Sequence, residues 1–195
     1  MIAALYVMDD GPYAGRTDVD LWDEARDARG YPGPFPVVAH PPCARWGRFF
    51  WRDGSTEPGH DGGLFEHALS MVHRYGGVLE HPAGSAAWDA FDLPTPPREG
   101  GWVRHPPSLL PRPKGWACHV EQGRYGHMAP KPTWLYCVLP SCPPALLWGE
   151  SDQARGVIHA EGGSRQSICT RLSKRQRTLT PPSFADMLVG LAAKV

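Results

Sequence analysis

The sequence lacks an excess of charge of either sign. Its 195 residues include 20 basic and 20 acidic side chains, so the formal net charge is zero. No overall field therefore attracts the chain to nucleic acid or to a membrane surface. The sequence also has no apolar run long enough to span a membrane and no basic leader followed by an apolar stretch. We expect a cytoplasmic protein with no membrane partner.

Cysteine is scarce, with five residues and no spacing typical of a disulfide framework. We interpret these residues as reduced thiols, which suits a cytoplasmic protein. Eight tryptophans argue against disorder, and 22 glycines with 22 prolines predict many loops. The length suffices for one domain with a sizeable core, so we expect a single domain over residues 1–195, with irregular loops at 92–115 and 140–163. No obligate protein partner is evident.

Short apolar runs predict the strands and helices of an α/β domain. The expected strands cover residues 2–8, 35–39, 78–79, 116–120 and 133–138, the last two as an antiparallel pair. The expected helices cover residues 19–29, 63–75 and a final segment that opens at residues 181–183. Strands that alternate with helices favour a three-layer domain with a mostly parallel sheet.

Cys43 directly follows one of the predicted buried strands. In α/β proteins, ligands usually bind at the carboxyl ends of such strands. Pro41 and Pro42 make the turn before the thiol stiff. Arg45 and Arg48 would lower the pKa of the thiol if they lie close to it, and so favour the thiolate. The alternative is a small buried cysteine after a proline turn.

Glu80 also stands at the end of a predicted strand, one crossover away from Cys43. In a parallel βαβ unit the two side chains would face one crevice. Between them, residues 45–52 interleave arginines with aromatic residues, which suits phosphates and stacked bases. The same residues also fit a loop that packs its aromatic side chains on the core. Residues 165–177 are basic without an acidic residue, and fit either phosphate binding or simple solvation.

The loop after the first predicted strand contains acidic residues and glycines over residues 9–15. Glycines allow a close backbone approach, so this loop could hold a nucleotide-like cofactor. The loop is not a dinucleotide-binding fingerprint, and a plain turn would explain the same residues.

Three short motifs together resemble the cytosine-5 DNA methyltransferase family. They are Pro41-Pro42-Cys43, Glu80 at a strand end, and Gln122-Gly123-Arg124. The family has a proline-cysteine motif, a glutamate motif and a Gln-x-Arg-x-Arg motif in the same order. Here the first spacing is 37 positions and the second is 42, similar to the family's spacing. Residues 177–181 also resemble the family's Arg-x-Leu-Thr-Pro segment.

The resemblance implies a reduced Rossmann-like methyltransferase fold, S-adenosylmethionine as cofactor and a nucleic-acid partner, with DNA the expected one. It implies that Cys43 adds to carbon 6 of cytosine, that Glu80 bonds ring nitrogen 3, and that Arg124 holds the base carbonyl or a phosphate. The base must first be flipped out of a duplex. The residues expected at the cofactor are Asp9, Asp10, Gly11, Gly15 and Pro41. The residues expected at the substrate are Arg45, Trp46, Arg48 and Gln122.

The sequence departs from the family in several places. Residues 9–15 lack the Phe-x-Gly-x-Gly cofactor motif, and residues 15–36 leave little room for a second strand with a cofactor-binding acid. Glu80 is followed by His-Pro instead of Asn-Val, and the second arginine of the third motif is missing. The target-recognition domain is missing or tiny. These departures concern the cofactor and the target sequence more than the cysteine–glutamate pair.

Two other classes of function fit the sequence. One is a non-catalytic nucleic-acid-binding module that kept the fold and lost the cofactor pocket. The other is a metal-binding protein, because the chain has nine histidines and five cysteines, including His40 and Cys43 in a His-x-x-Cys arrangement. No pair has zinc-finger spacing, so we assign no metal ligands.

Overall fold

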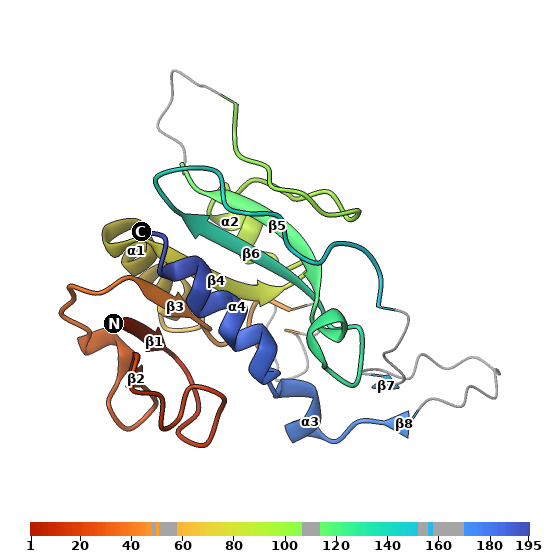
Figure 1. Cartoon of the computed structure of the whole chain (residues 1–195), viewed down its shortest axis with the longest axis horizontal. Coiled ribbons are helices and arrows are strands. Elements are labelled where there is room, and N and C mark those ends of the chain that lie inside the picture. Colours follow the sequence, from red (N-terminus) through yellow and green to blue (C-terminus); the bar gives the residue numbers. More distant parts are fainter. Residues whose placement is uncertain (48–49, 51–57, 107–113, 152–155, 158–169) are drawn as a thin grey trace.

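The computed structural model describes residues 1–47, 50, 58–106, 114–151, 156–157 and 170–195 (Figure 1). Arg48 therefore lies outside the described residues, and so do residues 165–169 of the basic stretch at 165–177. No helix in the described part of the chain has the length and apolar character needed to cross a membrane.

A six-stranded mixed sheet forms the centre of the fold, in the order β2-β1-β3-β4-β6-β5 (Figure 1). Strands β2, β1, β3 and β4 are parallel to one another, whereas β6 is antiparallel to both β4 and β5. The strands are β1 (Ile2–Leu5), β2 (Val19–Trp22), β3 (Val37–Ala39), β4 (Gly77–Pro82), β5 (Trp116–Glu121) and β6 (Pro132–Val138). The predicted α/β class and the predicted antiparallel pair are confirmed.

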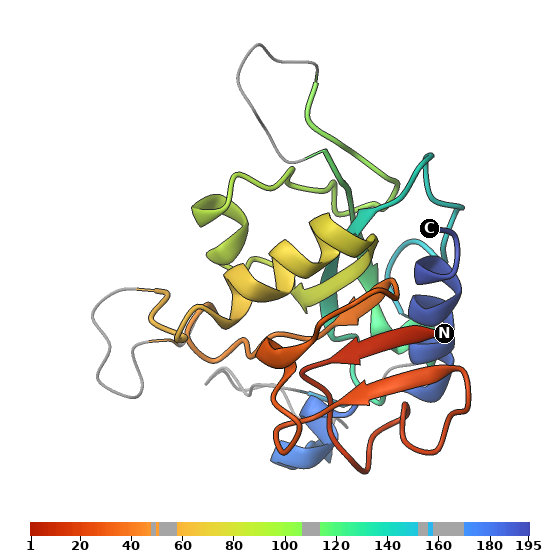
Figure 2. The ribbon, with the colours of Figure 1, turned by 90° about the vertical axis from the view of Figure 1, so that its left-hand side faces the viewer.

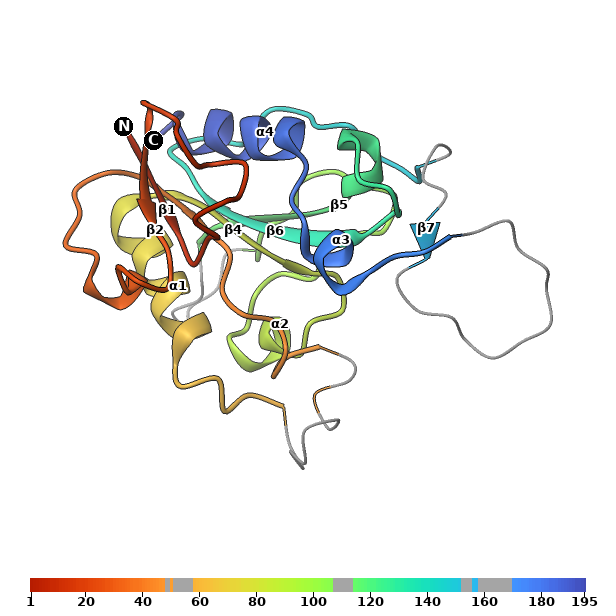
Figure 3. The same ribbon diagram turned by 90° about the horizontal axis from the view of Figure 1, so that it is seen from below.

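The two longest helices cover opposite faces of the sheet, so the domain has three layers (Figures 2 and 3). Helix α1 (Leu64–Tyr75) buries apolar side chains that recur at helical spacing, and it ends at Gly76. Helix α4 (Pro182–Ala192) packs its own buried apolar residues against the opposite face of the sheet. Both helices agree with the sequence prediction.

Short elements complete the described structure. They are the 3₁₀ turns η1 (Ala28–Gly30) and η3 (Gln122–Tyr125), the helices α2 (Ala87–Ala90) and α3 (Lys174–Thr178), and the strand pair β7 (Gly156–Val157) and β8 (Thr170–Arg171). Strand β7 falls within residues 140–163, for which the sequence predicts an irregular loop, so that prediction is wrong for residues 156–157.

The helix predicted for residues 19–29 is wrong. Val19 and Trp22 belong to β2, which pairs in parallel with β1, and the turn η1 replaces the rest of the expected helix. The expectation that residues 15–36 leave little room for a second strand is therefore also wrong. A four-residue strand carries too little periodicity to be distinguished from a helix, and its pairing with β1 decides its structure. The first strand also ends earlier than predicted, because Tyr6 has a positive φ of 60°.

The chain order of the strands creates a switch point in the sheet. The chain passes from β1 to β2 on one side and then crosses to β3 on the other side of β1. Ligands of open α/β sheets bind in the crevice at the carboxyl ends of the strands beside such a switch. The loops after β1, β3 and β4 therefore meet at one edge of the sheet.

Candidate active site

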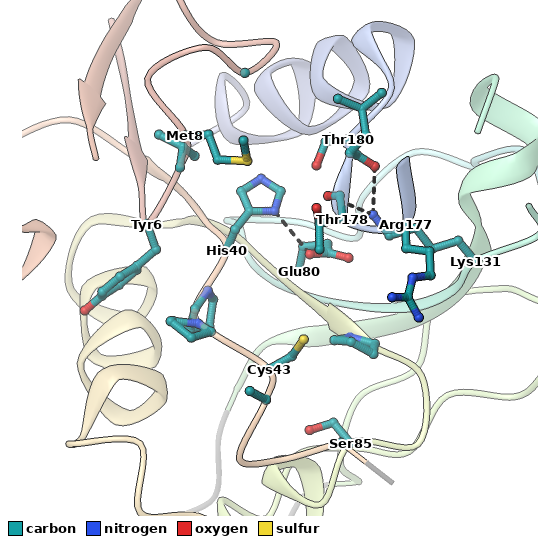
Figure 4. A pocket seen from close by; sticks show the side chains of 18 of the residues that line it. Tyr6, Met8, His40, Cys43, Glu80, Ser85, Lys131, Arg177, Thr178 and Thr180 are labelled. Atoms are coloured by element: carbon teal, nitrogen blue, oxygen red, sulfur yellow. Dashed lines mark hydrogen bonds and ion pairs between the residues drawn. The ribbon is translucent and has the colours of Figure 1, made fainter. Parts of the chain in front are cut away.

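A cavity of about 610 Å³ lies at this switch point. Its walls come from the loops after β1, β3 and β4, the residues that begin β6, and residues 177–180. This volume is in the range of pockets for small molecules and would also admit a single nucleotide base. Figure 4 shows Cys43, Glu80 and Lys131 around this cavity. Cys43 and Glu80 thus face one crevice, as their positions at strand ends predict.

His40 and Glu80 form the polar centre of the cavity. The register of β3 with β4 pairs Ala39 with Leu79. The residues that follow this pair, His40 and Glu80, therefore lie side by side. His40 Nδ1 is 3.1 Å from Glu80 Oε2, and each side chain is only 13% exposed (Figure 4). The other ring nitrogen of His40 is 2.8 Å from the hydroxyl of the buried Tyr13. The Tyr13 hydroxyl and the Glu80 carboxylate therefore fix the orientation of the imidazole.

Gln122 holds the second oxygen of the same carboxylate. Its Nε2 donates to Glu80 Oε1 at 2.9 Å and to Thr133 Oγ1 at 3.0 Å. Gln122 is fully buried and is not among the residues that line the cavity. We expected this side chain at the substrate, but the structure places it behind Glu80. Gln122 therefore acts on the site by positioning the glutamate.

The surroundings keep Glu80 ionised. Burial by itself would raise the pKa of this carboxyl group, but the hydrogen bond and charge of His40, followed by the charge of Lys131, hold the pKa below its ordinary value. Burial lowers the pKa of Lys131, and the negative charges of Glu80 and Cys43 oppose that shift. The cavity thus contains a glutamate and a lysine that influence each other's charge.

Cys43 is solvent-accessible in the cavity, so the alternative of a buried structural cysteine does not apply. The protein around the thiol still desolvates it, and this burial together with the Glu80 charge raises the pKa of Cys43. Among the described residues, Lys131 is the cation whose charge opposes this rise in the pKa of the thiol. The prediction that arginines lower the pKa of Cys43 is therefore wrong for Arg45, which does not line the cavity. Arg48 lies outside the residues that the structure describes.

Trp46 belongs to the core. It is buried, its Nε1 donates to Asp61 Oδ2 at 2.7 Å, and its ring packs against Phe65 with centroids 5.8 Å apart. The alternative that this loop packs its aromatic side chains on the core is thus correct for Trp46. Neither Trp46 nor Arg45 contributes to the wall of the cavity.

Arg124 does not reach the site. It is exposed on η3, and its guanidinium donates to the carbonyl of Glu150 at 3.1 Å. In the turn η3, Gln122 is buried, whereas Arg124, two positions later, faces solvent. Lys131, which the sequence analysis did not single out, lines the cavity instead. A lysine between Pro130 and Pro132 at the start of a predicted strand could have indicated this position.

The residues expected at the cofactor are only partly brought together. Asp10, Gly11 and Pro41 line the cavity, whereas Gly15 does not. Asp9 lies in an adjoining hollow together with residues that follow β2. A Cβ atom on Gly11 would lie 3.1 Å from the carbonyl oxygen of Met8, so the turn itself accounts for that glycine.

The segment of residues 177–180 forms one wall of the cavity. Lys131 Nζ donates to the carbonyl oxygens of Leu179 at 2.9 Å and Thr178 at 3.4 Å. At the rim, Arg175 of α3 pairs with Asp10 at 2.7 Å. Residues distant in the sequence thus close this part of the cavity.

Among the described residues, no group of three or more histidine, cysteine, aspartate or glutamate side chains is arranged to hold a metal ion. Comparison of the chain with models of known families, with curated proteins and with solved structures gives no match.

Proposed function

We propose that this protein transfers a methyl group from S-adenosylmethionine to carbon 5 of cytosine in DNA through a covalent adduct with Cys43. The observation that carries the proposal is the meeting of an accessible thiol, a hydrogen-bonded glutamate and a lysine in one cavity at the switch point of the sheet. These groups are what addition to a pyrimidine ring requires: a nucleophile, a partner for ring nitrogen 3, and a positive charge.

The order of the strands supports a reduced Rossmann-like methyltransferase fold. The antiparallel strand β6 lies between β4 and β5, near one edge of the sheet. Four parallel strands precede it in the sheet order, and the cavity lies at their carboxyl ends.

The wall beside β1 suits a nucleoside-type cofactor. Val7 and Met8 offer apolar surface for a purine ring, and the carboxylate of Asp10 can accept hydrogen bonds from hydroxyl or amino groups. S-adenosylmethionine, when bound, supplies the methyl group as an electrophile. Pro41 contributes a stiff wall between this part of the cavity and the thiol.

The covalent step follows from the protonation states of the side chains. Glu80 is a carboxylate in the free protein, so it can accept the proton of the Cys43 thiol and pass it to ring nitrogen 3. The Cys43 sulfur forms a bond to carbon 6, and the electron pair of the ring double bond makes carbon 5 nucleophilic. Carbon 5 would take the methyl group as the bond between that methyl group and the cofactor sulfur breaks, which would leave S-adenosylhomocysteine. The proton on carbon 5 then leaves to solvent, the bond between sulfur and carbon 6 breaks, and ring nitrogen 3 returns its proton through Glu80, so that Cys43 is restored.

A nucleic acid is the partner that best fits the rim of the cavity. Lys174 and Arg175 are exposed on α3, directly before the segment that forms one wall. Exposed cations beside a base-sized cavity suit phosphate groups that flank an extruded base. Because the chain has no net charge, this attraction is local to the rim.

Trapping of the adduct tests the proposal. An oligonucleotide with 5-fluorocytosine blocks the final elimination, because the fluorine on carbon 5 does not leave as a proton does. With S-adenosylmethionine present, we expect a complex that survives denaturation for the parent protein and for Cys142→Ser, a second exposed cysteine. Cys43→Ser should form none. If no variant forms the complex with an oligonucleotide that the protein binds, the chain is a binding module and the proposal fails.

A further inference from the structure

Lys131 is an unusual residue of the cavity in both its backbone and its side chain. Its φ angle of 47° lies in the left-handed region, which non-glycine residues adopt at a cost of about 1 kcal/mol or more. Tyr6, across the same cavity, also has a positive φ. Such conformations occur where the surrounding structure requires them, and they cluster at functional sites. The fold thus holds Lys131 in a conformation that it would not adopt by itself.

The ammonium group of Lys131 has capacity left for a ligand. Within the part of the chain that the structure describes, its hydrogen-bond acceptors are the carbonyl oxygens of Thr178 and Leu179. An ammonium group has three donor protons, so one remains. The two carbonyl groups fix the direction of the nitrogen, and the opposite charges that act on it are those of Glu80 and Cys43.

We propose that Lys131, and not Arg124, supplies the positive charge of this site: it stabilises the Cys43 thiolate and the negative charge that moves onto the pyrimidine ring when the thiolate adds. The part of this inference that concerns the ring rests on the proposed function, whereas the part that concerns the thiolate does not. When sulfur bonds to carbon 6, the electron pair of the ring double bond shifts toward carbon 5 and the ring carbonyl. A fixed ammonium beside that charge stabilises it without reorganisation.

Other charged and titratable groups also face the cavity. They are Tyr6 and Asp10 from the loop after β1, His40 after β3, Glu80 on β4 and Arg177 on α3. Glu80 acts on the thiol in the direction opposite to that of Lys131. A change at Lys131 should therefore leave Glu80 as the dominant charge near the thiol.

Alkylation of Cys43 tests the effect on the thiolate without any substrate. The rate of reaction with iodoacetamide, followed on the Cys43 peptide by mass spectrometry across pH 6–10, reports the thiolate fraction. We expect Lys131→Gln, which keeps a donor for the carbonyl groups and loses the charge, to slow the reaction at pH 8 by about tenfold, as expected for a shift of one pKa unit. Lys131→Arg should stay close to the parent. Lys194→Met, at an exposed lysine outside the cavity, is the matched control.

Adduct formation with the 5-fluorocytosine oligonucleotide tests the effect on the ring. Lys131→Gln should slow it by about a hundredfold, and Arg124→Ala should leave it unchanged. An unchanged alkylation profile in a folded Lys131→Gln protein would overturn the inference, even if the parent forms the adduct. A slowed alkylation with no adduct in any variant would support the role of Lys131 at the thiol and reject methyl transfer.

Discussion

Replacement of Glu80 by glutamine keeps the size of a buried side chain and removes its charge. The carboxylate accepts one hydrogen bond from Gln122 at 2.9 Å and contacts His40 Nδ1 at 3.1 Å. A glutamine offers one oxygen, so one of these two partners must face its amide NH₂ group. Leaving a buried donor without an acceptor is costly, whereas exchanging both partners for apolar groups often is not.

The expected loss of stability follows from these two contacts. A hydrogen bond to a charged group contributes about 1.5–3 kcal/mol to stability. Of the contacts of Glu80 with Gln122 and His40, the variant loses one hydrogen bond, and the remaining one is weaker because the acceptor has no charge. We therefore expect Glu80→Gln to lower the free energy of unfolding at pH 7 by about 3 kcal/mol. For a chain of this length that corresponds to roughly 6–12 °C in Tm.

The pH dependence has a definite sign. The pKa of Glu80 is lower in the folded protein than its ordinary value of 4.5. Its charge therefore contributes stability that is fully present above pH 4.5 and is lost as pH falls through the folded pKa. The difference between the parent and Glu80→Gln should be largest near neutral pH and should shrink in acid.

Urea unfolding of both proteins between pH 3 and pH 7 measures this difference. Glu150→Gln serves as the control, because Glu150 is exposed and its partner Arg98 is 3.4 Å away. Such a surface pair contributes at most about 1 kcal/mol. Equal stability of Glu80→Gln and the parent at pH 7, or a difference that persists unchanged at pH 3, would refute this account of the buried carboxylate.

Three further substitutions test the fold and the site. Gly77→Ala should cost at least about 4 kcal/mol or prevent folding in urea titrations, because its Cβ would lie 2.0 Å from the carbonyl oxygen of Val37. Gly190→Ala lies inside α4, where, apart from the adjoining residues and the nearby helix backbone, no described atom comes within 4 Å of the new Cβ; it should instead stabilise the protein by about 0.5–1 kcal/mol. Gln122→Met should slow adduct formation about tenfold without changing oligonucleotide affinity, because it removes one hydrogen bond to the Glu80 carboxylate. An unchanged rate would show that Gln122 does not position Glu80.

Local patterns in the sequence determined the longer elements. The apolar residues of α1 recur at helical spacing over three turns and end at two glycines, so no other structure fits them as well. The β5–β6 pair has enough aromatic and β-branched residues to be predicted. Strand β2 could not be predicted in this way, because four residues hold little periodicity and the neighbouring strand supplies their hydrogen bonds.

The candidate site, like the fold, could be predicted from the sequence only in part. The rule that ligands bind at strand ends was enough to place Cys43 and Glu80 at one crevice, because the direction of a strand fixes where its last side chains lie. Spacing along a loop carries no such information. Only the tertiary structure decided that Arg124 faces solvent, that Gln122 lies behind Glu80, and that Lys131 enters the cavity, because the turns of η3 and the β5–β6 hairpin set those directions.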